Sequence, residues 1–425
     1  MRRIIGITAA LAVACSATLA TAGPASTAAR ATLSPPECVK ADNGTCLPIA
    51  PDEKRVDLDT PVFTNPLNVD NPLHPSAKVS QVIYGGHVGG KPFRTEFTLL
   101  SKPKVVRGVP CVALQYIAYS DGRIEEIAVD WFAQDDEGAV WYFGEDVSDF
   151  KDGVVHTHEG TWRAGRDGAP IAMIMPGNPK VGDVYRTENA PGIAFEEVTV
   201  LSVGETLKVS ELHTDRKREI KVFKRGYGEY STESTDRKDI EIASLAVPTD
   251  HREGKPDPAY MAAVKKTLRA VYGNDWGGAS LGALRRAFTA VPGVPAVLQK
   301  QTEADIALLG KAVAKRKPRL AHQAALRLAQ DELDLRLLHQ SVPAVDRAKL
   351  GMWARQVTVD AADKNMGGVL GDIVVLGLIR DRVRHTLSTA DAAFLDRGIR
   401  VLRKAAKAKD LAAVSRKGAA LDHRF

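Results

Sequence analysis

The sequence predicts a multidomain α+β protein, in which an antiparallel β meander or partial barrel is followed by an all-α helical bundle. Residues 111–149 carry three apolar runs joined by turn signals at 120–122 and 135–138, a pattern typical of antiparallel strands. After residue 257 the composition shifts toward Ala, Leu, Arg and Lys, which favours helices. The net charge also changes sign between these two parts, which indicates two bodies with different surfaces.

The first 22 residues are typical of a secretory signal peptide. Arg2 and Arg3 precede a short apolar run at 4–13, and the segment 20–22 reads Ala-Thr-Ala, a small-residue cleavage site. The sequence therefore predicts a secreted or extracytoplasmic protein, with lipid anchoring at Cys15 as the alternative. Residues 23–77 are rich in Pro, Ala, Thr and Asn, so we expect an extended N-terminal linker there.

The remaining cysteines fit an exported chain. Cys38 and Cys46 flank a short polar loop, and such a pair in an exported segment predicts a local disulfide. Cys111 lies in the most apolar run, so we expect a buried free thiol, because a reactive thiol needs an electropositive and partly exposed site. No later run reaches about 18 uninterrupted apolar residues, and no transmembrane segment is expected.

The antiparallel β domain is expected over residues 78–247. Short runs of β-branched and aromatic residues alternate with turn signals such as Asp152-Gly153. The even spacing favours a meandering sheet that curls into a partial barrel. The inner face of such a sheet can hold an apolar ligand, or its own side chains can fill it. The expected strands cover residues 93–100, 109–119, 124–132, 140–143, 154–157, 171–175, 184–187, 195–203, 207–213, 219–224 and 240–247.

One segment of this β domain resembles a known group of proteins. Residues 130–146 read DWFAQDDEGAVWYFGED, and Gly160-Thr161-Trp162 and the segment 175–183 follow in the same pattern. This resembles a family of uncharacterised secreted bacterial β-rich proteins over roughly residues 78–205. The resemblance implies a β fold and a secreted location, and it implies no activity.

A linker at residues 248–257 and a basic helical bundle at 258–425 complete the chain. Asp257 before Pro258 predicts a capped helix start. Leu350, Trp353 and Val357 recur at the spacing of one helix face. The short turns between periodic segments favour an antiparallel bundle. The expected helices cover residues 258–272, 280–290, 295–315, 318–340, 344–362, 367–387, 389–408 and 410–422.

The overall charge of +6 conceals a strong asymmetry. Residues 35–256 hold 26 Lys and Arg against 36 Asp and Glu, while residues 257–425 hold 29 against 16. In the bundle, Arg397, Arg400, Lys404 and Lys407 recur on one helix face, opposite the apolar stripe. This basic face is solvated, or it meets an anion: the acidic β domain of the same chain, or an anionic component of the cell envelope such as a phospholipid surface. No nucleic acid is expected as a partner.

The sequence offers one candidate for a metal site. His156 and His158 are two residues apart, so in a strand they share one face. With a nearby carboxylate they could bind Zn²⁺ or Cu²⁺, although an exposed pair of histidines in contact with solvent is the plainer interpretation.

Two further motifs resemble catalytic signatures but lack their context. Residues 278–282 match the G-x-S-x-G pattern, yet they lie in a helical region without a preceding strand, so we expect Ser280 to begin a helix instead. The glycine-rich run at 85–90 lacks the residues of a phosphate-binding loop and is expected to form a turn or bulge.

These observations favour an exported binding or scaffold protein of the cell envelope, without a recognisable catalytic centre. One alternative is a metal-dependent enzyme or metal-binding protein whose site lies at the junction of the two domains. Another is a carrier that holds a lipid or other apolar ligand in the curled sheet. The sequence names no cofactor, and the question of enzymatic activity stays open, with non-enzymatic binding favoured.

Overall fold

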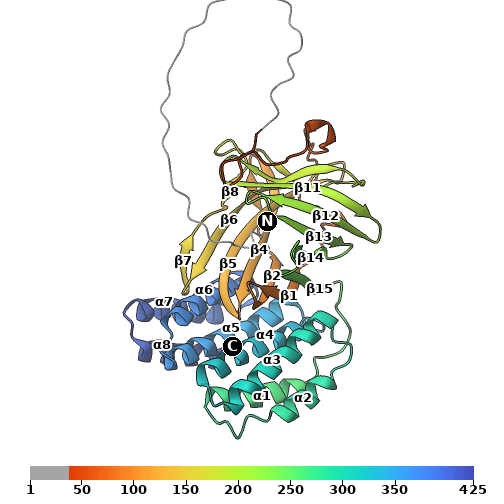
Figure 1. The fold of residues 1–425 in the computed structure, drawn as a ribbon. Helices are drawn as coiled ribbons and strands as arrows, with labels where there is room; N and C mark the ends of the chain where they lie inside the picture. Colours follow the sequence, from red (N-terminus) through yellow and green to blue (C-terminus); the bar gives the residue numbers. More distant parts are fainter. Residues whose placement is uncertain (1–37) are drawn as a thin grey trace, which may run out of the picture.

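The computed structural model of the chain describes residues 38–425. A large antiparallel sheet built from residues 81–247 curls on itself, and eight helices from residues 258–424 pack against it (Figure 1). This two-part α+β architecture confirms the fold class that the sequence predicts. The proposed signal peptide and Cys15 lie outside the described residues.

The sheet is a continuous series of antiparallel strands, and β1 and β15 pair at its centre. Strand β1 (Gln81–Val88) pairs with both β2 (Lys91–Leu99) and β15 (Ile240–Val247), so the first and last strands of the segment are neighbours. The strand order is β10-β11-β12-β13-β14-β15-β1-β2-β4-β5-β6-β7. The other strands are β3 (Lys104–Val106), β4 (Val109–Ser120), β5 (Arg123–Gln134), β6 (Val140–Lys151), β7 (Val154–Thr157), β8 (Trp162–Arg163), β9 (Ala172–Met175), β10 (Val184–Ala190), β11 (Ala194–Val203), β12 (Thr206–His213), β13 (Arg218–Lys224) and β14 (Gly228–Ser234).

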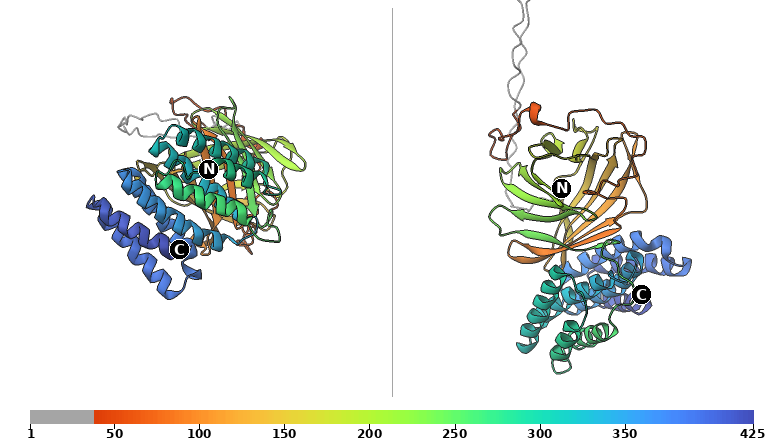
Figure 2. Two further views of the ribbon diagram at one scale, coloured as in Figure 1. Left: turned by 90° about the horizontal axis from the view of Figure 1, so that it is seen from below. Right: turned by 90° about the vertical axis from the view of Figure 1, so that its right-hand side faces the viewer.

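The curl of the sheet gives it a concave inner face and a convex outer face. Short strand β9 pairs with β6 and also approaches β10, so the two ends of the sheet come near each other. The core of the inner face therefore combines side chains from both halves, including Phe132 and Tyr142 from one side and Tyr185 and Phe223 from the other. Figure 2 shows this curl from the side, with the helices below it.

Several strands, most clearly β1 and β14, are not predicted from the sequence. The glycine-rich run at 85–90 is the reason for the first miss, because only Gly89 and Gly90 form the expected turn. Gly85 and Gly86 lie inside β1, where a Cβ on Gly86 would come within 1.8 Å of the Ile240 carbonyl oxygen. Here glycine permits the close approach of a neighbouring strand rather than a reversal of the chain.

The eight helices match the expected ones to within a few residues. Asp257 caps the first of them, since its side chain accepts a hydrogen bond from the Tyr260 amide. Ser280 precedes the second helix, as expected, although its side chain makes no capping hydrogen bond. The helices are α1 (Pro258–Tyr272), α2 (Leu281–Thr289), α3 (Ala296–Ala314), α4 (Pro318–Arg336), α5 (Val342–Ala362), α6 (Met366–Val383), α7 (Thr389–Lys407) and α8 (Leu411–Arg424). In the described part of the chain, no helix is both long enough and apolar enough to cross a membrane.

The segment before β1 has little regular secondary structure, as expected for residues 38–77. Its first part nevertheless packs on the outer face of β11 and β12, where Leu47 contacts the buried pair Phe195 and Leu212, and its later residues Val69 and Leu73 belong to the inner core. The expected disulfide joins Cys38 to Cys46, and Cys111 is a buried free thiol.

Apolar side chains join the helices to the convex face of the sheet. Ile83 and Leu245 of the central strands share a core with α1, α3 and α4. On the other side, Tyr119 of β4 stacks on Trp353 of α5 with ring centroids 5.7 Å apart. Residues 248–257, the expected linker, contain no helix or strand, and the two parts that they connect share buried cores.

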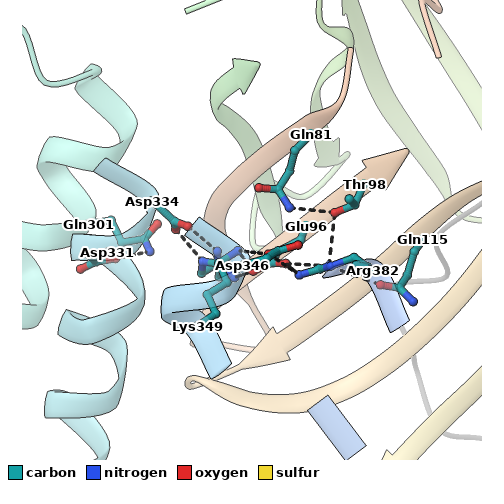
Figure 3. Close-up of polar contacts among 11 residues, drawn as sticks. Gln81, Glu96, Thr98, Gln115, Gln301, Asp331, Asp334, Asp346, Lys349 and Arg382 are labelled. Carbon is teal, nitrogen blue, oxygen red and sulfur yellow. Dashed lines mark hydrogen bonds and ion pairs between the residues drawn. The ribbon is translucent and has the colours of Figure 1, made fainter. Parts of the chain in front are cut away.

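A buried network of ion pairs crosses the same interface (Figure 3). Glu96 of β2 accepts hydrogen bonds from Lys349 Nζ at 2.7 Å and Arg382 Nη1 at 3.2 Å. Arg94 lies 2.9 Å from Glu96 and binds both carboxylate oxygens of Asp334 in α4. Arg382 also binds Asp346 at 2.7 Å. The three acids and three bases balance in charge, and all six are buried.

Two further ion-pair groups lie at the edges of this interface. Arg123 of β5 binds Asp360 of α5 and lies 3.3 Å from Asp372 of α6. Arg327 of α4 pairs with Asp121, in the turn between β4 and β5, and with Asp305. Charged residues of the sheet and of the helices are therefore paired with each other at three places, which fixes how the helices sit on the sheet.

Candidate functional site: acidic residues on the concave face

The concave face of the sheet carries an unusual number of carboxylates. Side chains alternate between the two faces of a strand, and residues directly opposite on neighbouring strands share a face. The strand register places ten acidic residues on the inner face: Glu126, Asp130, Glu145, Asp149, Glu188, Glu196, Glu211, Glu219, Glu229 and Glu241.

Many of these carboxylates lie directly opposite each other. Glu211 faces Glu219, Glu188 faces Glu196, and Asp130 faces Glu145 across neighbouring strands. Like charges at opposed positions destabilise a sheet. Sequences that keep such pairs on a buried face therefore sacrifice stability, which is a common property of functional sites.

Two basic side chains stand among the acids, Lys221 and His213. Lys221 pairs with Glu211, and further carboxylates around it raise its pKa well above the ordinary value in spite of burial. Burial disfavours the charged form of His213, but the surrounding carboxylates of Glu196, Glu219 and Glu211 outweigh this and raise its pKa to about 10. Both groups are cations at neutral pH, which partly offsets the surrounding negative charge.

The carboxylates themselves respond to crowding and burial. Burial and the neighbouring Asp130 carboxylate raise the pKa of Glu145 to about 7. Burial also raises the pKa of Glu211, and the nearby Glu196 carboxylate adds to that effect. Perturbed pKa values of this kind concentrate at functional sites, although ion-pair networks also produce them.

The concave face is more apolar on its central strands, between the two groups of acids. Tyr84, Phe97 and Tyr116 form a row of rings across β1, β2 and β4. Beside them a cavity of about 60 Å³ is lined by apolar side chains together with His74, Ser76 and Glu229. That volume holds a few water molecules, and the side chains of the sheet fill most of the neighbouring space.

We predict that His74 makes the protein sensitive to mild acid. Burial lowers the pKa of His74 to about 4, from an ordinary value of 6.5. A lowered folded-state pKa means that stability is intact above pH 6.5 and declines as the pH falls toward 4. The loss should reach about 3 kcal/mol. Urea unfolding of the wild type and of His74→Gln between pH 7 and 4 checks this, and parallel pH profiles would contradict it.

The structure does not assemble a site around His156 and His158. His156 lies in β7, which ends at Thr157, so His158 falls outside the strand and the two are not held on one strand face. Both are exposed, and His158 Nδ1 lies 2.8 Å from the Val147 carbonyl oxygen. In the described residues, the one group of three potential metal ligands is Glu196, Glu211 and His213.

The predicted anion-facing residues are exposed on α7, as the helical pattern requires. Arg397, Arg400, Lys404 and Lys407 point to solvent, opposite the buried Leu395, Ile399 and Leu402. Contacts between the sheet and the helices use other bases, namely Arg94, Arg123, Arg327, Lys349 and Arg382.

The sequence does not predict that the ten concave acids lie together. A weak signal exists, because Glu211 and His213 follow an i, i+2 pattern on one strand. The others come from seven further strands, and only the register of those strands brings them together.

No protein-family model matches this sequence, and a comparison with curated proteins returns no significant match. The resemblance to secreted bacterial β-rich proteins therefore stays a prediction. The fold and its concave acidic face define a class by architecture alone: a curled antiparallel sheet with helices on its convex side.

Proposed function

We propose that this protein is an exported binding protein that holds a cationic ligand on the concave face of its sheet. The observation that carries this proposal is the set of ten inward-facing carboxylates, several of them directly opposite one another, with Lys221 and His213 among them. A cation bound there relieves the repulsion between opposed carboxylates, so binding and stability increase together.

An unpartnered polar group supports the same site. Tyr185 is fully buried on the inner face, and its hydroxyl makes no hydrogen bond with any part of the chain that the structure describes. It lies close enough to Glu211 and Lys221 for both to affect its pKa. Buried hydroxyls without a partner are costly and uncommon, so a ligand at this place would supply the contact that the chain does not.

The junction of the two parts supports a structural role instead of a second site. In the network around Glu96, three buried acids and three buried bases pair with one another and balance in charge. A metal ion there would have to displace Lys349 or Arg382 from Glu96, and that exchange leaves a buried cation without its partner.

Titration calorimetry with spermidine tests the proposal. We expect the chain lacking its leader to bind this triamine, and binding should weaken at high salt because charges drive it. The Glu126→Gln/Asp149→Asn variant, which removes two half-buried carboxylates of the concave face, should bind about tenfold or more weakly. The matched control is Glu137→Gln/Glu205→Gln, which removes two exposed charges.

Three results would count against the proposal: no spermidine binding, an equal loss of spermidine affinity in the control variant, or a spermidine affinity that does not change with salt concentration. The control is informative because it alters the net charge equally while leaving the concave face intact. A loss shared by both variants would mean that overall charge, and not this face, attracts the triamine.

A second candidate function rests on the basic face of α7. Its four cations are exposed, and in residues 38–425 none of them makes an ion pair. We propose that this face meets an anionic surface of the cell envelope. Arg400→Glu/Lys404→Glu should lose binding to vesicles that contain phosphatidylglycerol at low salt, while Arg285→Glu/Lys300→Glu on α2 and α3 should retain it. Equal binding by both double variants would refute the idea.

A further inference from the structure

Four side chains of the concave face converge on one point. Glu211 and His213 are two residues apart on β12 and share the inner face. Glu219 lies opposite Glu211 on β13, and Glu196 lies opposite His213 on β11. One potential ligand atom from each of Glu196, Glu211 and His213 lies within 4.8 Å of the other two.

The two ring nitrogens of His213 have different surroundings. Nδ1 lies 3.2 Å from Glu196 Oε1, a contact that orients the ring. Nε2 faces Glu219 Oε2 at 3.6 Å and Glu211 Oε2 at 3.8 Å, and it makes no hydrogen bond. These distances are too long for hydrogen bonds. They are close to the separation of roughly 3.3 Å between two ligands of a tetrahedral ion with bonds of about 2.0 Å.

Several polar atoms at this point lack a hydrogen-bond partner although they are buried. His213 Nε2, Glu219 Oε2 and the Tyr185 hydroxyl all belong to this group, and their residues are at least nine-tenths buried. An acidic cluster alone would say little about a ligand. Within residues 38–425 the Tyr185 hydroxyl makes no hydrogen bond, and His213 Nε2 and Glu219 Oε2 face each other at 3.6 Å without forming one, which indicates that another group completes the site.

We propose that His213, Glu211 and Glu219 bind a divalent transition-metal ion, with Zn²⁺ as the best match, and that Glu196 orients the imidazole ring. The set combines one imidazole with carboxylate oxygens, and imidazole favours Zn²⁺, Ni²⁺ and Cu²⁺ over Ca²⁺ and Mg²⁺. Carboxylate contact at the second ring nitrogen is the usual arrangement for a metal-binding histidine. This inference rests on the proposed function, because it names one cation for the same concave face.

Binding of the ion requires Lys221 to give up its ion pair with Glu211. Glu229 lies near enough to Lys221 to raise its pKa, so Lys221 still has a carboxylate beside it on the same face after it leaves Glu211. The ion also takes the place of the proton on His213, so both nitrogens of the ring keep a partner.

Calorimetric titration of the metal-free full chain with Zn²⁺, and absorption spectroscopy with Co²⁺ as a coloured substitute, test the inference. His213→Gln should weaken Zn²⁺ binding by about 100-fold or more and abolish the Co²⁺ bands, because it removes the one nitrogen ligand. Glu196→Gln should cost about 10- to 100-fold, as expected for a residue that orients the ring. His156→Gln/His158→Gln is the matched control, and we expect it to bind like the wild type.

A variant with no change in charge guards against misfolding. Tyr185→Phe removes only the unpartnered hydroxyl, so it should fold like the wild type and alter the Co²⁺ spectrum if that hydroxyl approaches the ion. Wild-type affinity in His213→Gln, or loss of binding only in the His156→Gln/His158→Gln control, would overturn the inference.

The spermidine assay separates this inference from the proposed function. If His213→Gln still binds spermidine while the wild type fails to bind Zn²⁺, the metal site is wrong and the cationic ligand is organic. If the wild type binds Zn²⁺ through His213 but never binds spermidine, the concave face selects a metal ion. If neither cation binds, both proposals fail.

Discussion

Replacing Glu96 by Gln is expected to lower the free energy of unfolding by about 3 to 5 kcal/mol, the usual cost of breaking a buried ion pair. Glu96 is 2% exposed and touches three cations, Lys349, Arg94 and Arg382. The substitution leaves those cations in the interface with only Asp334 and Asp346 as partners. An uncompensated buried charge is costly because water cannot reach it.

Urea denaturation monitored by circular dichroism and by tryptophan fluorescence measures this effect. The exposed Glu205→Gln is the control and should change the unfolding free energy by less than about 0.5 kcal/mol. Since the sheet and the helices share this network and two apolar cores, we also expect one cooperative transition for both signals. A Glu96→Gln protein as stable as its control would show that the network contributes little.

Glu96 should also make the free energy of unfolding fall in acid, at a lower pH than His74 does. Burial opposes ionisation of Glu96, but Lys349, Arg94 and Arg382 outweigh it and hold its pKa well below the ordinary value of 4.5. A lowered carboxyl pKa gives stability that is present above pH 4.5 and is lost as the pH falls toward the folded-state pKa. Glu96→Gln should therefore show a flatter stability profile below pH 4.5 than the wild type.

Trp353→Ala is the second substitution with a large expected effect, about 3 to 5 kcal/mol. Trp353 is 2% exposed on α5 and stacks on Tyr119 of the sheet, so truncation leaves a cavity inside the interface. The loss combines the transfer energy of the indole ring with the unfilled volume.

Thermal and urea unfolding should show this destabilisation without any change in the strength of Zn²⁺ binding, because the concave face lies on the other side of the sheet. Leu320→Ala is the control, since Leu320 is 63% exposed and should cost less than about 0.5 kcal/mol. A minor effect of Trp353→Ala would mean that the neighbouring side chains collapse into the space.

Much of this fold was predictable because its elements obey simple periodicity. Leu350, Trp353 and Val357 recur at helical spacing, and all three lie on α5 and are buried in the core that the helices share with the sheet. The meander of β4, β5 and β6 followed from turn signals at 120–122 and 135–138, which the structure places between those strands. The prediction of a turn at Gly85 and Gly86 was wrong, because glycine occurs both in turns and where strands approach closely.

The ion-pair network around Glu96 and the acids of the concave face could not be predicted, for a different physical reason. Arg94 and Glu96 alternate with Phe93, Thr95 and Phe97, so the strand resembles one with an exposed polar face. That face is instead covered by helices more than 200 residues later in the chain. The concave acids show the same difficulty, because their meeting depends on the register of strands that the sequence cannot fix.

The pairing of β1 with β15 has a consequence for how the molecule folds. Gln81 lies beside Val247 in the sheet, so the central seam joins the two ends of the segment and carries the largest loop-closure entropy within it. High contact order slows folding, and we expect closure of this seam to be the rate-limiting step. Until it closes, the edges of β1 and β15 are open to pairing with other chains. The helices form from local contacts, but their charged side chains cannot pair with the convex face until β1 and β15 have paired.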